Sequence, residues 1–198
     1  MTEAGKRADA IESRQRLRVV FVEDNSEDAK LIARMLEESG YNLESKRVDK
    51  PESLKEYVAG ADPDLVISEY NLPGWTAIDA LDILKRSGKV IPVIVVSGSL
   101  GDEVAAECIK QGAIDYVLKD RMARLPYAIA HALEKKAAIQ KQRAGEAALH
   151  ASEERYRLLL DSTGEGIYGL DLKGICTFSN PSCVRMLGYG SAADLLGK

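Results

Sequence analysis

Chemically active side chains stand at the ends of four short apolar runs in this sequence. Glu23 and Asp24 follow the first run, and Glu69, Ser97 and Lys119 end the other three. The carboxyl ends of the strands in an α/β sheet lie at one edge, where such proteins bind their ligands, so we expect these side chains to lie close together. Carboxylates, a hydroxyl and an ammonium group form a compact site for a divalent cation and a phosphoryl group.

The elements that must position these side chains alternate along the chain from Leu17 to Arg121. Apolar runs at residues 17–22, 43–48, 64–69, 92–97 and 116–119 are separated by helical patterns. This alternation is typical of a parallel sheet with crossover helices. We therefore predict an α/β fold with a doubly wound, five-stranded parallel sheet in the flavodoxin-like strand order 2-1-3-4-5.

Charge and hydropathy narrow the class of protein. The net charge of −4 and the lack of a basic stripe argue against nucleic-acid binding. No run approaches the ~18 consecutive apolar residues that a membrane-spanning helix needs, so we expect no membrane partner. The three cysteines lack metal-binding spacing and no apolar signal segment opens the sequence, so we expect a cytoplasmic protein.

Residues 124–161 form a segment with strong helical character. The segment is rich in Ala, Glu, Lys, Gln and Leu, which favour helices, and its apolar stripe resumes between Ala148 and Leu160. We predict one long helix that continues into a coiled coil and joins two copies of the chain as a homodimer. Gly145 is the weakest position of this helix, and two helices broken near Gly145 are the alternative.

Residues 162–198 carry the pattern of two short strands joined by a turn. Gly166-Ile-Tyr-Gly-Leu-Asp-Leu-Lys-Gly174 is followed by Ile175-Cys-Thr-Phe-Ser-Asn-Pro181 and then by Met186-Leu-Gly-Tyr189. Together with the preceding Ser-Glu-Glu-Arg-Tyr-Arg, this pattern closely resembles the opening half of a PAS domain, which implies a partial α+β segment. Because only half of a PAS domain is matched, we expect the chain to be a piece of a longer protein.

Residues 17–123 resemble a response-regulator receiver domain in the order of their chemical groups: the acidic pair, Glu69, the hydroxyl and the ammonium group. Residues 1–16 before them are expected to form a polar leader. The resemblance implies that Glu69 occupies the phosphoacceptor position. It implies that Asp24, Glu69 and the backbone carbonyl of Asn71 hold Mg²⁺, which Glu23 reaches through water. It also implies a histidine kinase or a phosphotransfer protein as partner.

The same resemblance assigns roles to three further residues. Ser97 matches the hydroxyl that bonds an arriving phosphoryl group, and Tyr116 matches the aromatic switch that turns inward with it. An amphipathic residue at a strand edge explains Tyr116 equally well. Lys119 matches the ammonium group that pairs with the acceptor carboxylate. Receivers usually follow this lysine with a cis proline, whereas Asp120 follows here, which predicts a trans peptide.

Glu69 is the largest departure, because receivers usually carry aspartate at this position. The extra methylene moves the carboxylate into the volume of the phosphoryl group, and in-line transfer depends on where the nucleophile lies. We expect poor or no phosphorylation, weak or absent Mg²⁺ binding, and a direct ion pair between Glu69 and Lys119. Three explanations stay open: an inert pseudo-receiver, a charge that mimics phosphorylation, or an engineered substitution in an ordinary receiver.

These features predict a two-component (phosphorelay) signal-transduction receiver that relays its state through a coiled coil to a PAS-containing output region. The alternative is the input portion of a hybrid sensor histidine kinase or a diguanylate cyclase, although this sequence shows no ATP-binding glycine boxes and no cyclase signature.

His131 and His150 lie in the long helix, but an alanine follows each where phosphoacceptor histidines favour an acidic residue. A flavodoxin-like cofactor binder is excluded because Glu23 and Asp24 repel phosphate.

Overall fold

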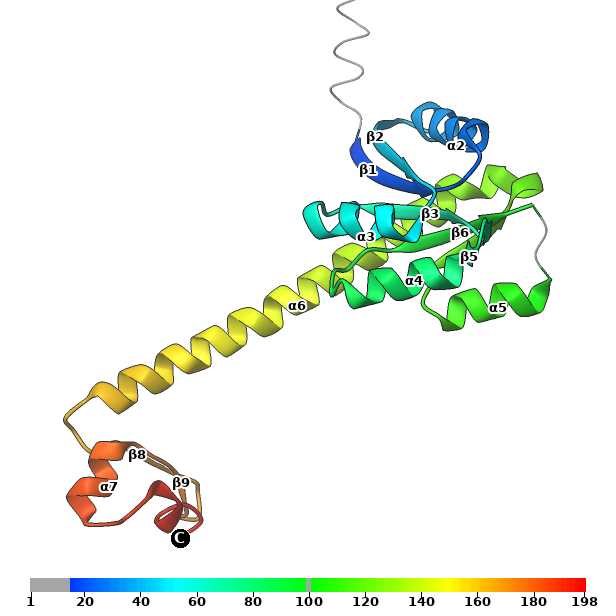
Figure 1. The fold of residues 1–198 in the computed structure, drawn as a ribbon. Coiled ribbons are helices and arrows are strands. Elements are labelled where there is room, and N and C mark those ends of the chain that lie inside the picture. The colour runs from blue at the N-terminus through cyan, green and yellow to red at the C-terminus, as the bar shows by residue number, and fades with distance from the viewer. Residues whose placement is uncertain (1–14, 99–100) are drawn as a thin grey trace, which may run out of the picture. The chain divides into compact units, whose positions relative to one another are not determined.

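The computed structural model describes residues 15–98 and 101–198. Five parallel strands form one sheet in the order β2-β1-β3-β6-β7 (Figure 1). They are β1 (Gln15–Val22), β2 (Tyr41–Val48), β3 (Leu65–Glu69), β6 (Val93–Ser97) and β7 (Asp115–Leu118). The predicted doubly wound sheet and its strand order are therefore confirmed.

Burial on both faces explains the continuous apolar sequences of the central strands. Every residue of β3 and β6 is buried, as expected for parallel strands covered by helices on both sides. The edge strand β2 is exposed at most positions, which explains its weak pattern. β1 begins at Gln15, so residues 15 and 16 belong to the sheet and not to the predicted polar leader. The rest of that leader, residues 1–14, lies outside the described residues.

Helices cover both faces of the sheet. They are α2 (Ser26–Glu38), α3 (Pro51–Gly60), α4 (Ala77–Arg86), α5 (Asp102–Lys110) and α6 (Leu125–Ser162), with the short 3-10 helix η1 (Lys119–Arg124) before α6. On one face α3, α4 and α5 contribute Leu54, Leu81 and Cys108 to a buried cluster. On the other face α2 and α6 contribute Leu36 and Ile129. Each face of the sheet therefore has its own core, as in other doubly wound domains.

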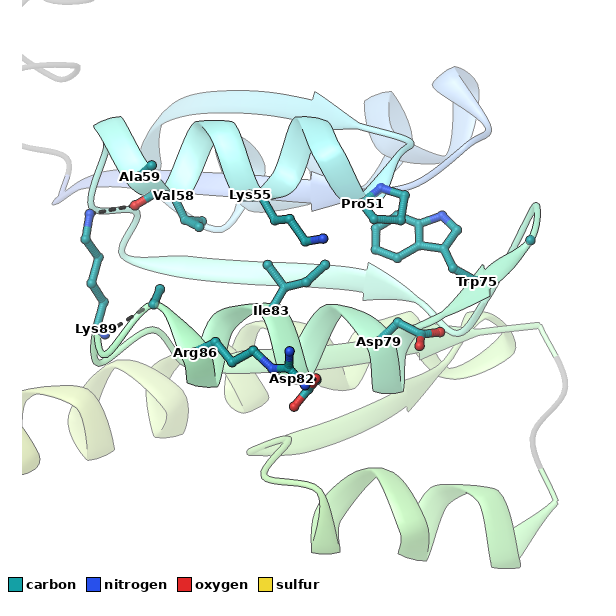
Figure 2. A pocket seen from close by; sticks show the side chains of 12 residues that line it. Pro51, Lys55, Val58, Ala59, Trp75, Asp79, Asp82, Ile83, Arg86 and Lys89 are labelled. Atoms are coloured by element: carbon teal, nitrogen blue, oxygen red, sulfur yellow. Dashed lines mark hydrogen bonds and ion pairs between the residues drawn. The ribbon is translucent and has the colours of Figure 1, made fainter.

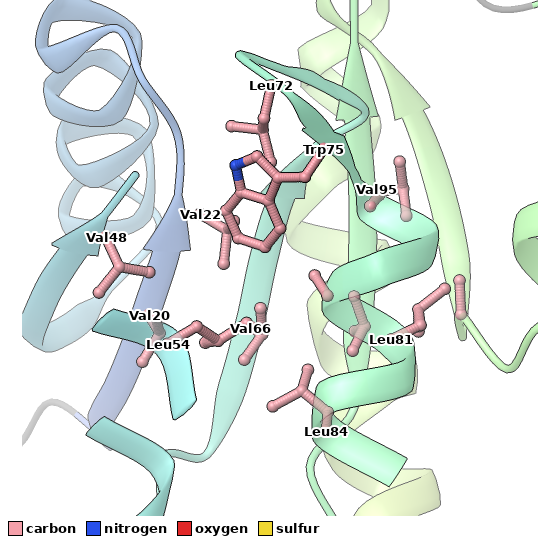
Figure 3. Packing of buried hydrophobic residues seen from close by; sticks show 14 of the residues in the cluster. Val20, Val22, Val48, Leu54, Val66, Leu72, Trp75, Leu81, Leu84 and Val95 are labelled. Atoms are coloured by element: carbon pink, nitrogen blue, oxygen red, sulfur yellow. The ribbon is translucent and has the colours of Figure 1, made fainter. Parts of the chain in front are cut away.

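A short hairpin follows β3 and closes one end of the first core. It consists of β4 (Asn71–Leu72) and β5 (Trp75–Thr76), and its turn places Gly74 at a positive φ of 81°, which favours glycine. Trp75 is buried beside Leu72 and Val22 (Figure 3), and its indole Nε1 donates to the carbonyl oxygen of Asp49 at 3.3 Å. The sequence did not predict the pairing of β4 with β5.

Helix α6 is continuous from Leu125 to Ser162 and passes Gly145 unbroken. The alternative of two helices broken near Gly145 is therefore wrong. The first turns of α6 bury an apolar face against the sheet, whereas residues 140–159 are exposed. No helix of the described residues, α6 included, is both long and apolar enough to cross a membrane.

A buried lysine marks the last turn of α6 that packs on the sheet. Lys136 Nζ donates to the carbonyl oxygen of Pro63 at 2.9 Å and lies 3.5 Å from Oδ1 of Asp64. The same carboxylate accepts hydrogen bonds from Arg18 Nε at 3.3 Å and Nη2 at 3.2 Å. Burial alone would raise the pKa of Asp64, but the hydrogen bonds from Arg18 and the charge of Lys136 outweigh it and hold that pKa below its ordinary value.

The chain divides into two compact units, with the division after Gln140. The second unit holds the end of α6, the antiparallel strands β8 (Tyr168–Leu170) and β9 (Cys176–Ser179), α7 (Pro181–Leu187) and the 3-10 helix η2 (Ala192–Asp194). Asn180 organises it: its Oδ1 accepts from the backbone N–H groups of Ile167 and Cys183, both at 2.9 Å. Its Nδ2 donates to the carbonyl oxygens of Leu160 and Glu165, also both at 2.9 Å. One buried amide thus ties the helix end, the loop before β8 and α7 together.

Candidate functional site

The carboxyl edge of the sheet brings the predicted side chains to one shallow depression. Nine residues line it: Glu23, Asp24, Asn25, Asp28, Glu69, Asn71, Ser97, Gly98 and Lys119. Glu69 and Ser97 are the last residues of β3 and β6, and Glu23 follows β1 directly. Six of the seven residues predicted for the site therefore lie together. The seventh, Tyr116, lies on β7 and packs partly buried against the first core.

Lys119 lies among three carboxylates. Its Nζ is 2.8 Å from Glu69 Oε2, 2.5 Å from Asp28 Oδ2 and 3.4 Å from Glu23 Oε2. The predicted direct ion pair between Glu69 and Lys119 is confirmed. The described residues contain no cis peptide bond, so the peptide before Asp120 is trans, as predicted. Lys119 itself begins η1 and is not the last residue of β7.

Asp28 is the site residue that the sequence did not reveal. The sequence places it in the first turn of α2, where acidic residues are common because they oppose the helix dipole. That turn starts directly after the loop that carries Glu23 and Asp24, so it faces the same edge of the sheet. The short loop before α2, in which Asn25 caps the helix, is therefore the sequence feature that indicates a place for Asp28 at the site. Its residue type alone does not.

Glu69 folds back on its own backbone. Its side chain is 9% exposed, and its Oε1 accepts from the backbone N–H of Tyr70 at 2.8 Å and of Asn71 at 3.3 Å. Its Oε2 contacts Lys119. Both carboxylate oxygens therefore already have partners, and the side chain is held at both of its atoms that could accept a phosphoryl group or bind a cation.

Glu23 is the most buried carboxylate of the site. It is 3% exposed, and its Oε1 accepts from the backbone N–H of Asn25 at 3.1 Å. Burial raises the pKa of Glu23 above its ordinary value, and neighbouring Glu69 adds to the rise, although Asn25 and Lys119 oppose it. For Lys119 burial acts to lower the pKa, but the hydrogen bonds to Asp28 and Glu69 outweigh it, so the pKa is raised and the ammonium group stays charged.

The remaining site residues differ in their burial. Asp24 and Asn71 are exposed at the rim, whereas Ser97 is buried. Arg47 Nη1, from β2, donates to the carbonyl oxygens of Glu23 at 2.9 Å and Asp24 at 3.3 Å and so fixes the loop that carries both acids.

The observed donor set does not fit a divalent cation. A bound Mg²⁺ needs oxygen ligands at about 2.1 Å in octahedral geometry. The oxygens of Glu69 are taken by Lys119 and the backbone, and those of Glu23 by Lys119 and Asn25. Among the described residues, no group of three or more His, Cys, Asp or Glu side chains is arranged to hold a metal ion. The Lys119 ammonium group supplies the positive charge at the centre of this edge.

A larger groove lies away from this edge, between α3 and α4 (Figure 2). Three of its charged side chains are paired within the protein. Lys89 Nζ donates to the carbonyl oxygens of Val58 and Ala61, both at 2.7 Å, and Arg86 pairs with Asp82 at 2.8 Å. None of the residues predicted for the site lines this groove, so the candidate site is the smaller depression at the sheet edge.

Two family models match the chain. The response regulator receiver domain matches residues 19–130, and the PAS fold matches residues 154–198. The chain is 34% identical over 103 residues to the nitrogen assimilation regulatory protein NtrX of Azorhizobium caulinodans, which covers 51% of this chain and 22% of that protein. It is 30% identical over 132 residues to the methanogenesis regulatory protein FilR1 of Methanothrix harundinacea, which covers 64% of this chain and 30% of that protein. The chain thus spans less than a third of the length of either relative.

Solved structures agree with the fold. The receiver domain dimer of NtrC4 in its beryllofluoride-activated form has a TM-score of 0.53 at 25% identity and covers 60% of this chain and 98% of that chain. A receiver domain protein of Clostridium thermocellum has a TM-score of 0.54 at 24% identity and covers 62% of this chain and 98% of that chain. With a receiver model that matches more than half of its residues, the chain belongs to the response-regulator receiver family and carries a PAS fold behind its receiver domain.

Proposed function

We propose that this chain is a receiver module that works without phosphorylation and relays its state through α6 to a PAS-containing output region. The observation that carries the proposal is the contact of 2.8 Å between Glu69 Oε2 and Lys119 Nζ. Receiver homologues imply a histidine kinase or a phosphotransfer protein as partner. In our proposal this partner contacts the receiver without labelling it.

The position of the Glu69 carboxylate supports a non-phosphorylatable site. An attacking oxygen must face the phosphorus in line, with the charge of the phosphoryl group neutralised by cations. Here one carboxylate oxygen points at Lys119 and the other accepts from the backbone, so neither is free to attack. The glutamate also supplies one negative charge next to the lysine, so Glu69 partly reproduces the pairing of a phosphorylated aspartate.

Receiver domains generally bind Mg²⁺. We propose that this one binds it weakly or not at all, with Glu23, Asp24, Glu69 and the carbonyl of Asn71 as the ligands if it does. The ion pairs of Lys119 support weak binding, because a cation would have to displace the ammonium group from two carboxylates that it already neutralises.

The exposed part of α6 supports the proposed relay segment. Leu149, Tyr156 and Leu159 are exposed and lie seven and three residues apart, which is the spacing of coiled-coil core positions. We propose that they meet the same residues of a second copy and hold two receivers in parallel. The proposed divisions are the receiver at residues 17–123, the relay helix at 124–161 and the PAS segment at 162–198.

Intact-mass spectrometry after incubation with acetyl phosphate and Mg²⁺ tests the proposal. The native chain should gain no phosphoryl group, whereas Glu69→Asp should gain one, because the shorter side chain restores the usual position of the nucleophile. Glu69→Gln is the matched control, since it keeps the side-chain length but removes the nucleophilic charge. Near-stoichiometric labelling of the native chain would overturn the proposal.

A further inference from the structure

We propose that Asp28 is a positioning residue that holds Lys119 and competes with a phosphoryl group for its ammonium protons. The inference rests on the proposed function, because it explains further why the site at Glu69 is closed. Two carboxylates then prevent Lys119 from binding a phosphoryl group. One is Glu69 at the sheet edge, and the other is Asp28 on helix α2.

The distances single out Asp28 among the partners of Lys119. Its Oδ2 lies 2.5 Å from Nζ, closer than either Glu69 at 2.8 Å or Glu23 at 3.4 Å. The Asp28 side chain is 34% exposed, so this charge-assisted hydrogen bond is only partly screened by water. α2 fixes its position, because Asn25 caps the helix by accepting from the N–H of Glu27 at 2.9 Å.

The number of ammonium protons makes the competition direct. A lysine ammonium group donates at most three hydrogen bonds. Three carboxylate oxygens lie within 3.4 Å of Lys119 Nζ, so the nearby acceptors within the protein are as many as the protons. An arriving phosphoryl oxygen must displace one of them. Asp28 lies on α2, so a substitution there removes one acceptor of Lys119 and keeps both carboxylates of the sheet edge, Glu23 and Glu69.

The negative charge of these carboxylates also opposes the binding of a phosphoryl group. Glu23, Glu69 and Asp28 surround a single ammonium group, so the edge stays negative and repels an incoming phosphoryl group. Neutralising Asp28 both frees one proton of Lys119 and lowers this repulsion.

The same helical turn provides a matched control. Glu27 precedes Asp28, is equally placed to oppose the helix dipole, and pairs with Lys30 at 2.7 Å on the exposed side of α2. A role of Asp28 in stabilising the helix alone predicts that Glu27→Gln and Asp28→Asn behave alike. A role in holding Lys119 predicts that they differ.

The first experiment measures the initial rate of labelling by acetyl phosphate with Mg²⁺ in full-length chains that carry Glu69→Asp. Adding Asp28→Asn should raise the rate about tenfold, as expected when a charge-assisted hydrogen bond no longer competes. Adding Glu27→Gln should leave it unchanged, and adding Asp28→Glu should restore slow labelling. Equal rates for the Asp28→Asn and Glu27→Gln chains would overturn the inference.

The second experiment does not depend on phosphorylation. Nitrogen-15 NMR of the lysine ammonium groups in the native chain should show a slowly exchanging Lys119 signal, whose exchange with water speeds up in Asp28→Asn but not in Glu27→Gln. Labelling of the native chain by acetyl phosphate would overturn the proposed function alone, and this measurement still decides the role of Asp28, even if Glu69→Asp takes up no phosphoryl group. Unchanged exchange in Asp28→Asn would overturn it.

Discussion

The ammonium group of Lys119 contacts three acidic side chains at the edge of the sheet. Each of these carboxylates loses water on folding, and the lysine compensates for that loss in all three at once. The arrangement is therefore asymmetric. Removing one acid leaves the lysine with two partners, whereas removing the lysine takes the ammonium partner from all three acids.

Lys119→Met should accordingly lower the free energy of unfolding by about 3 kcal/mol at neutral pH, because it leaves partly buried carboxylates without a counter-charge. Urea denaturation of the native and substituted chains measures the difference. The loss should shrink in acid, where the carboxylates become protonated. A change below about 0.5 kcal/mol, the size of an ordinary surface substitution, would contradict the structure.

Glu23→Gln should have the opposite effect. Burial raises the pKa of Glu23 above its ordinary value of 4.5, so stability falls as the pH rises from that ordinary value through the raised pKa. The amide keeps the acceptor for Asn25 and removes the charge, so stability at pH 7 should rise. Below pH 4.5 the native side chain is protonated in both states and the gain should vanish. A thermal melt at each pH tests both the sign and the window.

Residue types alone predicted most of this edge. The acids, the hydroxyl and the lysine follow apolar runs, and parallel strands bring their ends together regardless of side-chain detail. Asp28 was not predicted as a site residue because it belongs to a helix turn. No periodicity in the sequence indicates which way that turn faces. The fold-back of Glu69 onto the N–H groups of Tyr70 and Asn71 depends on backbone angles that a sequence pattern does not carry.

At the scale of the elements, α6 is joined to the sheet by packing and by one buried charge. Its apolar face was predictable from the spacing of Leu125, Ile129 and Ala132. Lys136 was not, because the sequence shows two adjacent lysines and only the structure distinguishes the buried Lys136 from the exposed Lys135. The pairing of β4 with β5 was missed for a similar reason, since two residues per strand are too few to form a pattern.

Lys136→Ala should lower the free energy of unfolding of the receiver by about 2 kcal/mol, because the Pro63 carbonyl and the Asp64 carboxylate lose a buried donor. Lys135→Ala is the matched control on the exposed neighbour and should change it by less than about 0.5 kcal/mol. Denaturant titration of both variants measures the difference. Equal effects would show that Lys136 does not anchor the helix.

The pKa of Asp64 adds a pH dependence to this anchor. The folded pKa lies below the ordinary value of 3.8, so the ionised carboxylate stabilises the fold above that value and the contribution is lost as the pH falls through the folded pKa. The stability difference between the native chain and Asp64→Asn should therefore be full at pH 7 and should decline below about pH 4. A difference that persists unchanged at pH 2 would contradict the assignment.

At the scale of the whole molecule, the question is how many copies of the chain act together. The stripe of Leu149, Tyr156 and Leu159 faces water on a single chain, and coiled-coil pairing would cover it. Light scattering of the full chain should give twice the chain mass of 21.6 kDa at micromolar concentration. Leu149→Glu combined with Tyr156→Glu should give a monomer, while Glu153→Lys, also exposed on α6, should not. A monomeric native chain would rule out the proposed dimer.

The indole of Trp75 provides an optical reporter confined to one part of the chain. Trp75 is the only tryptophan in the sequence, and it is enclosed at the end of the receiver core next to the hairpin. Emission excited at long wavelength therefore arises from the receiver alone, and the PAS segment contributes no tryptophan fluorescence. A red shift on denaturation should follow the opening of that core, while the circular dichroism of α6 follows the helix. Two midpoints in one titration would show that the receiver and the relay helix unfold separately.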